Sequence, residues 1–412
     1  LFITGQFYGV DTITAVSNGS QIMHMMTVII VGLAMGTTVT IGHSVGAKCM
    51  EQAEKIIGNT ITLFMGIAVA FTVILVVLVK PIVVLIATPQ EAVAGTSIYL
   101  LICFIGIPFI TAYNIISSIF RGLGDSKSPM YFIGIACVMN IALDYLFMGA
   151  FHMGAAGAAL GTVCAQTFSV LVALWVIRRR KTGISLKKSD FKIERAVIGQ
   201  VLKIGIPVAL QDGFIQVAFM IITVIANSRG VSDAAAVGVV EKVISALFIV
   251  PSSMLATVSA LSAQNLGAGK EKRATDTLHY ATVITTIYGM IVAVLIQFIA
   301  ENVVGIFTSD TTVVTMGSAY IRSYIWDCIF AGIHFSFSGY FAACGKSYIG
   351  FLHNIISITF VRVPGSYLAS KYFTDTLYPM GLAAPAGSLV SVAICVTAFI
   401  LLKRKSRVAQ TA

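Results

Sequence analysis

Residues 57–79 read IGNTITLFMGIAVAFTVILVVLV, a stretch without a charged side chain. About 20 consecutive apolar residues are enough for one helix to cross the hydrocarbon core of a bilayer. A helix is the expected form because it satisfies its backbone hydrogen bonds internally, as a lipid environment requires. Residues 57–79 are therefore predicted to form a transmembrane helix.

Similar apolar runs follow one another along the whole chain. The sequence is 57% hydrophobic and only 11% charged, which is about half the charged fraction of a typical soluble protein. A transmembrane barrel would need short segments of alternating hydrophobicity, whereas these runs are continuous. We predict an all-α polytopic membrane protein with eleven spans, at about 20–44, 57–79, 93–119, 129–149, 154–177, 201–227, 234–262, 277–299, 313–341, 348–369 and 380–402.

The basic residues are concentrated in alternate loops. The net charge is +10, and 20 of the 27 lysines and arginines fall in the loops at about 46–56, 121–128, 178–197, 267–275 and 345–347 and in the tail after residue 402. The opposite loops hold only three, namely Lys80, Arg229 and Lys371. By the positive-inside rule the first set lies in the cytoplasm, so the charge orients the protein and does not indicate nucleic-acid binding.

Identical residues recur 221 positions apart in three separate segments. They are Ala15, Val16, Gly46, Ala47, Ala53, Phe120, Gly124 and Ser126, which recur as Ala236, Val237, Gly267, Ala268, Ala274, Phe341, Gly345 and Ser347. Two similar halves in an apolar chain are typical of transporters that consist of two helical bundles around a central site.

The repeat gives the second half six spans but the first half only five. With eleven spans and a cytoplasmic C-terminus, Leu1 would lie outside. We therefore expect one further helix of about 30 residues upstream of Leu1, which gives two pseudo-symmetric six-helix bundles with both ends in the cytoplasm. The expected domains are an N-lobe at 1–178, a basic linker at 179–197, and a C-lobe with the tail at 198–412.

Four short segments carry a family resemblance. They are FRGLGDS at 120–126, NIALD at 140–144, AQNLGAGK at 263–270 and GKS at 345–347. With these motifs in this order, the chain resembles the prokaryotic branch of the multidrug and toxic compound extrusion (MATE) family. The resemblance implies a secondary exporter of organic cations and other amphipathic compounds, driven by inward flow of protons or sodium. It also implies that the visible spans are helices 2 to 12, and that an acidic residue of helix 1 precedes Leu1.

Four carboxylates lie well inside the predicted spans: Asp144, Asp212, Glu241 and Asp327. An ionised carboxylate in the membrane costs at least about 2.5–3.5 kcal/mol, so each needs a partner, water or a proton. Asn140 lies four residues before Asp144, hence on the same helical face. The resemblance implies that Asn140, Asp144 and Thr162 belong to a protonation network of the N-lobe. The alternative is a structural polar cluster between two helices.

In the second half, the resemblance implies a cation-coupling role for Asp327. The alternative is an internal ion pair of Asp327 with Arg322. A substrate cavity is predicted from Asp212 with its polar neighbours Gln211 and Gln216, and from Trp326 and His334, which lie near Asp327 in the sequence. The helix-7 glutamate of sodium-coupled relatives is replaced by Ile215, which weakens a sodium site of that type. For Glu241 we favour salt bridging between helices.

The resemblance implies a multidrug efflux antiporter with H+ or Na+ as the coupling ion, and the two similar halves predict that it works by rocking-bundle alternating access. The alternative is a lipid-linked glycan flippase of the same superfamily, which would line its cavity with basic residues. The scattered cysteines and histidines indicate neither a disulfide framework nor a metal site, and no enzymatic constellation is visible. We expect a monomer in the cell membrane that needs no cofactor and handles small organic cations. The coupling ion and the substrate stay open.

Overall fold

The computed structural model describes residues 2–86, 88–179 and 184–411, and these form helices joined by short turns, without a strand. The predicted all-α polytopic fold is confirmed. Part of the predicted linker, residues 180–183, lies outside the described residues. The chain separates into two compact units, Leu1–Gly205 and Ile206–Ala412.

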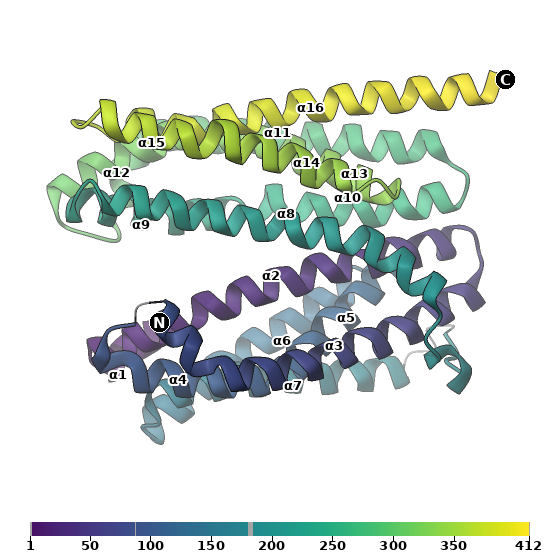
Figure 1. Cartoon of the computed structure of the whole chain (residues 1–412), viewed down its shortest axis with the longest axis horizontal. Coiled ribbons are helices and arrows are strands. Elements are labelled where there is room, and N and C mark those ends of the chain that lie inside the picture. Colours follow the sequence, from purple (N-terminus) through teal and green to yellow (C-terminus); the bar gives the residue numbers. More distant parts are fainter. Residues whose placement is uncertain (1, 87, 180–183, 412) are drawn as a thin grey trace. The chain divides into compact units, whose positions relative to one another are not determined.

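The first unit holds five of the predicted spans. Its elements are α1 (Phe2–Phe7), α2 (Val10–Gly46), α3 (Met50–Leu85), α4 (Gln90–Ile105), α5 (Ile107–Leu123), α6 (Lys127–Asp144), the π-helix η1 (Tyr145–Ala150), α7 (Gly154–Arg179) and the 3-10 turn η2 (Lys188–Phe191). In Figure 1 these elements run from purple to blue. Helix α2 packs on α4 and α5, and α6 packs on α7.

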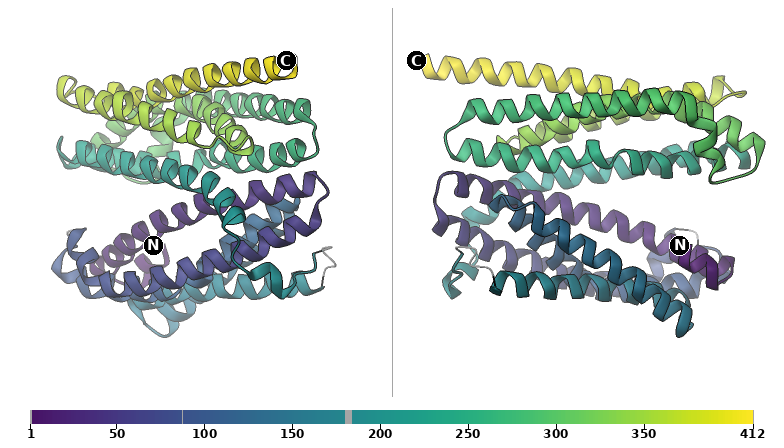
Figure 2. Two further views of the ribbon diagram at one scale, coloured as in Figure 1. Left: turned by 45° about the vertical axis from the view of Figure 1, so that its right-hand side comes forward. Right: turned by 180° about the vertical axis from the view of Figure 1, so that it is seen from behind.

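The second unit holds the other six. Its elements are α8 (Arg195–Asn227), whose first turns belong to the first unit, α9 (Val231–Leu247), α10 (Ile249–Gly267), α11 (Glu271–Gly305), α12 (Thr311–Tyr324), α13 (Asp327–Ala343), α14 (Tyr348–Ser357), the π-helix η3 (Ile358–Arg362), α15 (Val363–Tyr372) and α16 (Tyr378–Thr411). Both views of Figure 2 show α16, in yellow, alongside the α14–α15 segment that it contacts.

Eight helices among the described residues are long and apolar enough to cross a membrane, and a ninth span results if α4 and α5 count as one. Those two helices meet at Gly106 with a bend of 50°. The remaining predicted spans, 313–341 and 348–369, are helical but interrupted. The first breaks between Tyr324 and Asp327, and the second passes through η3.

The internal repeat extends to the helix boundaries. Helices that begin at Val10, Met50, Gln90 and Lys127 have counterparts that begin 221 residues later, at Val231, Glu271, Thr311 and Tyr348. The turns recur as well: Gly124 (φ 92°) and Gly345 (φ 69°) both adopt the left-handed conformation that glycine tolerates best. The two halves therefore share one backbone plan.

The start of α8 crosses α2 at very short range. A Cβ added to Gly36 would lie 2.0 Å from the carbonyl oxygen of Val201, and one added to Gly205 would lie 2.3 Å from that of Leu33. Only glycine allows backbones to approach this closely, as is typical of packed membrane helices. The first turns of α8 are thereby fixed to the first unit.

The described part of the linker is also attached to the first unit. The buried Asn59 on α3 donates from Nδ2 to the carbonyl oxygen of Asp190 (3.1 Å), and its Oδ1 accepts from the backbone N–H of Glu194 (2.7 Å). The hydroxyl of Thr62 donates to the carbonyl of Phe191 at 3.0 Å. Residues 184–194 therefore lie on α3 as an ordered strap.

Alanine at Gly36 or Gly205 is expected to lower the stability of the protein by about 1–3 kcal/mol, because the new methyl group meets a backbone carbonyl that has no room to move. Thermal unfolding in detergent measures the effect. The matched control is Gly199→Ala on the same helix α8, where an added Cβ has no neighbour within 4 Å. Equal melting temperatures for Gly36→Ala and Gly199→Ala would contradict the close crossing.

Asn59→Ala is expected to release the strap, because it leaves a buried carbonyl and N–H without partners, at a cost of about 1–3 kcal/mol. Limited trypsin digestion at Lys187, Lys188 and Lys192 should become several-fold faster. Asn302→Ala, at an exposed position of α11, is the control. Unchanged cleavage in Asn59→Ala would show that other contacts hold the strap.

Candidate functional site

The carboxyl group of Asp144 lies at the end of α6, where the helix widens into η1. Across from it, α7 presents Gly161, and a Cβ added there would lie 2.1 Å from Oδ1 of Asp144. The small residue thus makes room for the carboxyl group between two closely packed helices. π-Helical turns inside longer helices occur frequently at functional sites.

Polar side chains of three helices surround this carboxyl group. Asn140 donates from Nδ2 to Oδ1 of Asp144 across a long 3.4 Å. Tyr99 on α4 interacts electrostatically with Asp144, and its hydroxyl hydrogen-bonds with Thr162. Thr162 also donates to the carbonyl oxygen of Ala158 at 3.1 Å. The structure therefore brings Asn140, Asp144 and Thr162 together and adds Tyr99 to them.

A cavity of about 110 Å³ opens beside Thr162 inside the first unit. Its lining is mixed: Met23, Thr27, Cys103, Ile110, Tyr113, Asn114, Thr162 and Gln166. Oε1 of Gln166 is buried and has no hydrogen-bond partner among the described residues. A space of this size with a free polar atom suits a few water molecules or a small polar group.

In the second unit, Asp327 is the first residue of α13, directly after the break that follows α12. It is 1% exposed, and its Oδ1 has no hydrogen-bond partner in the part of the chain that the structure describes. Ser388 hydrogen-bonds to the carboxylate, and the guanidinium of Arg362 interacts with it electrostatically. Broken helices are a recurring way to place ion-binding groups within a membrane.

The alternative pairing of Asp327 with Arg322 is not formed. Arg322 donates from Nη2 to Oε1 of Glu301 on α11, at 3.2 Å. The physical reason is helix geometry, since residues five apart point in different directions and Arg322 extends from the other side of the break. Glu241 approaches Thr223 on α8 (3.4 Å) and interacts electrostatically with Arg362, while Lys242 is exposed.

His334 lies on α13 and is buried on the side that faces α16. Its Nε2 lies 3.5 Å from Oγ of Ser388, and its ring is 5.4 Å from that of His353 on α14. His353 in turn shares a 2.8 Å hydrogen bond with Ser338. Nδ1 of each histidine is buried without a partner. The two histidines and two serines form a polar strip in the interior of the second unit.

The remaining predicted cavity residues do not form one patch. Gln211 is 1% exposed and points toward α14, where a Cβ on Gly350 would lie 2.7 Å from its Oε1. Asp212 and Gln216 are partly exposed and lie on another face of α8, four residues apart. Trp326 occupies the break before α13 and packs against the hydrophobic core.

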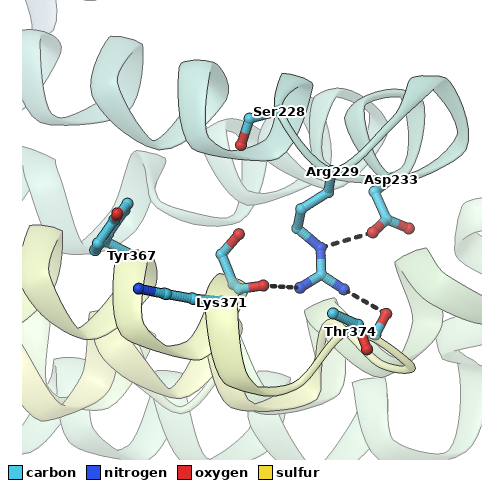
Figure 3. Close-up of a pocket in the computed structure, with 7 residues that line it drawn as sticks. Ser228, Arg229, Asp233, Tyr367, Lys371 and Thr374 are labelled. Atoms are coloured by element: carbon cyan, nitrogen blue, oxygen red, sulfur yellow. Dashed lines mark hydrogen bonds and ion pairs between the residues drawn. The ribbon is translucent and has the colours of Figure 1, made fainter.

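A pocket of about 490 Å³ in the second unit lies at the ends of α8, α9 and α15 and not at these carboxylates. Figure 3 shows the side chain of Arg229 pointing to Asp233 and to the loop before α16. Its guanidinium donates to Asp233 (2.7 Å) and to the carbonyls of Ser370, Phe373 and Thr374 (2.9 Å each). With its donors occupied in this way, Arg229 fastens the loop, and we assign the pocket a structural role.

Sequence reasoning did not identify Tyr99, Tyr324 and His353. Each is a single polar side chain in an apolar run, which more often packs or faces lipid than forms part of a site. A pattern of polar residues four apart, as with Asn140 and Asp144, is visible in a sequence, whereas contacts between helices are not. Among the described residues, no group of three or more histidine, cysteine or acidic side chains is arranged to hold a metal ion.

Comparison with known proteins gives one consistent result. The MatE family model matches residues 1–146 and 207–368. The probable multidrug resistance protein YpnP of Bacillus subtilis (strain 168) is 29% identical over 379 residues, which are 92% of this chain and 84% of YpnP. The probable multidrug resistance protein YoeA of the same organism is 25% identical over 399 residues, 95% of this chain and 86% of YoeA.

Among solved structures, the outward-facing conformation of a multidrug resistance MATE family transporter of the MOP superfamily matches with a TM-score of 0.91. It is 18% identical, and the match covers 100% of this chain and 92% of that chain, a likeness of fold alone. The family model itself covers most of the sequence. The chain therefore belongs to the MatE family and is a multi-pass membrane protein of the multidrug and toxic compound extrusion transporters.

Proposed function

We propose that this protein is a secondary active exporter of organic cations and other amphipathic compounds, coupled by antiport to an inward cation gradient. The observation that carries the proposal is the carboxyl group of Asp144. It lies against Gly161, accepts a hydrogen bond from Asn140 and interacts electrostatically with Tyr99, which hydrogen-bonds with Thr162. Removal of a carboxylate from water makes it bind a proton or another cation more readily.

The coupling step follows from this arrangement. When Asp144 is ionised, it offers the first unit a negative charge near the small cavity that Thr162 lines. A proton that neutralises Asp144 removes the charge that favours a bound organic cation, so the two compete. Alternating access of the two helical bundles would then exchange one for the other across the membrane. We favour a proton over sodium as the coupling ion. The site has one carboxyl group that can bind a proton, and an amide donor and two hydroxyl groups lie around it.

In the second unit, Asp327 is the candidate cation-coupling residue. The candidate residues of the substrate cavity are Asp212, Gln211, Gln216, Trp326 and His334. We further propose that the protein acts as a monomer without an enzymatic activity in the cell membrane, with its C-terminus in the cytoplasm. A flippase for lipid-linked glycans would gather cations around its substrate. The interior of the second unit instead combines the carboxylates of Glu241 and Asp327 with one guanidinium, that of Arg362.

Asp144→Asn keeps the shape of the side chain but removes its titration, so we expect export driven by a pH gradient to fall at least about tenfold. Uptake of ethidium into everted membrane vesicles measures this. Asp375→Asn, at an exposed position in the loop before α16, is the control and should transport normally. Ethidium transport at the normal rate in Asp144→Asn would refute the role of Asp144.

Imposing each gradient alone identifies the coupling ion. In sealed proteoliposomes, a pH gradient without sodium should drive accumulation of the probe cation, while a sodium gradient at equal pH on both sides should not. The reason is that the site in the first unit has one titratable carboxyl group and uncharged partners. Transport driven by sodium alone would contradict proton coupling and leave the assignment of the family intact.

A further inference from the structure

Arg362 is the last residue of η3, and its side chain extends into the interior of the second unit. Its guanidinium carbon lies 5.0 Å from the ring centre of Phe219 and 5.6 Å from that of Tyr324. Nη2 donates to the hydroxyl of Tyr324, and Nε is buried without a hydrogen-bond partner. The guanidinium of Arg362 is therefore held by the rings of Phe219 and Tyr324 and by the hydroxyl group of Tyr324.

Two carboxylates face this guanidinium from different helices. Glu241 on α9 lies beside Thr223, whose hydroxyl is 3.4 Å from both carboxylate oxygens. Asp327 on α13 has an unpartnered Oδ1. Both carboxylates interact electrostatically with Arg362, whereas Nη2 of the guanidinium donates its hydrogen bond to Tyr324. The attraction thus acts over a distance and leaves carboxylate oxygens available.

These four side chains, Phe219, Glu241, Tyr324 and Asp327, are here called the Arg362 cage. Aromatic faces combined with carboxylates form the arrangement by which proteins recognise organic ammonium ions. Phe219, Glu241 and Arg362 are partly exposed, whereas Tyr324 and Asp327 are buried beneath them. A ligand could therefore reach the cage once the guanidinium has left it. Two carboxyl groups thus share one guanidinium in the cage.

We propose that Arg362 is an internal stand-in ligand, which occupies an organic-cation site of the second unit until a transported cation displaces it. The inference rests on the proposed function and adds to it a second binding site and a reason for selectivity. A cation must compete with a tethered guanidinium, so weakly binding or uncharged compounds fail to open the cage. When no organic cation is bound, Arg362 supplies the positive charge that pairs with Glu241 and Asp327.

The backbone around Arg362 gives the side chain freedom to move. Pro364 follows two residues later and has no N–H to donate to the carbonyl of Phe360. The segment Ile358–Arg362 is π-helical, a form that often marks places where a helix changes its register. A change of this segment between π and α geometry would rotate Arg362 relative to α12 and α9.

The test is equilibrium binding of tetraphenylphosphonium to the purified protein in detergent, without any gradient. In Arg362→Met the apparent Kd should fall about tenfold, because apparent affinity rises as the fraction of molecules with a free site rises. Tyr324→Phe keeps the ring but loses the hydroxyl that holds Arg362, and the Kd should fall about two- to threefold. Adding Glu241→Gln to Arg362→Met should reverse the gain.

The matched control is Arg322→Met, which removes a guanidinium of the same unit that pairs with Glu301 outside the cage. Its Kd should match that of the unaltered protein. No gain in Arg362→Met, or an equal gain in Arg322→Met, overturns the proposal. If Arg362→Met does not fold, as judged by size-exclusion chromatography, Tyr324→Phe decides, and an unchanged or weaker affinity there overturns it. If the unaltered protein binds no organic cation, the proposed function itself fails.

Discussion

A carboxylate that folding removes from water must be neutralised, and this requirement shapes both units of the chain. In the first unit, Asp144 lies against Gly161, and its described side-chain partners are the amide of Asn140 and the hydroxyl of Tyr99. In the second unit, the guanidinium of Arg362 interacts electrostatically with both Glu241 and Asp327. The proposed mechanism follows from this difference. Asp144 binds a mobile cation such as a proton, whereas Glu241 and Asp327 already face the positive side chain of Arg362.

The internal repeat makes the difference informative. The residues that lie 221 positions after Asn140 and Asp144 are Val361 and Gly365, and Asp327 corresponds to Gly106. Helix starts and left-handed turns are shared between the halves, yet Asn140, Asp144 and Asp327 have no polar counterparts in the other half. The repeat therefore preserves the scaffold, while each unit carries its own chemistry on it. Gly106 and Asp327 both lie at a break in the helix. The same backbone feature therefore carries a small packing residue in the first half and a carboxyl group in the second.

Much of the fold was predictable because the membrane allows few alternatives. Long apolar runs must be helices, and the 221-residue repeat fixed the order of the elements. The sequence also indicated that Asn140 and Asp144 share a helical face, and the structure places them together. Contacts between helices were beyond such reasoning. Arg322 turns to Glu301, and Gln211 lies against Gly350 of α14, because crossing angles and helix breaks decide which side chains meet.

The central claim is that a proton on Asp144 and an organic cation exclude each other. Its most direct test is proton release from the purified protein in weakly buffered detergent when tetraphenylphosphonium is added. The account predicts that the protein releases protons as the cation binds, with a dependence on pH, and that Asp144→Asn binds without releasing any. Release from Asp144→Asn equal to that of the unaltered protein would contradict the account.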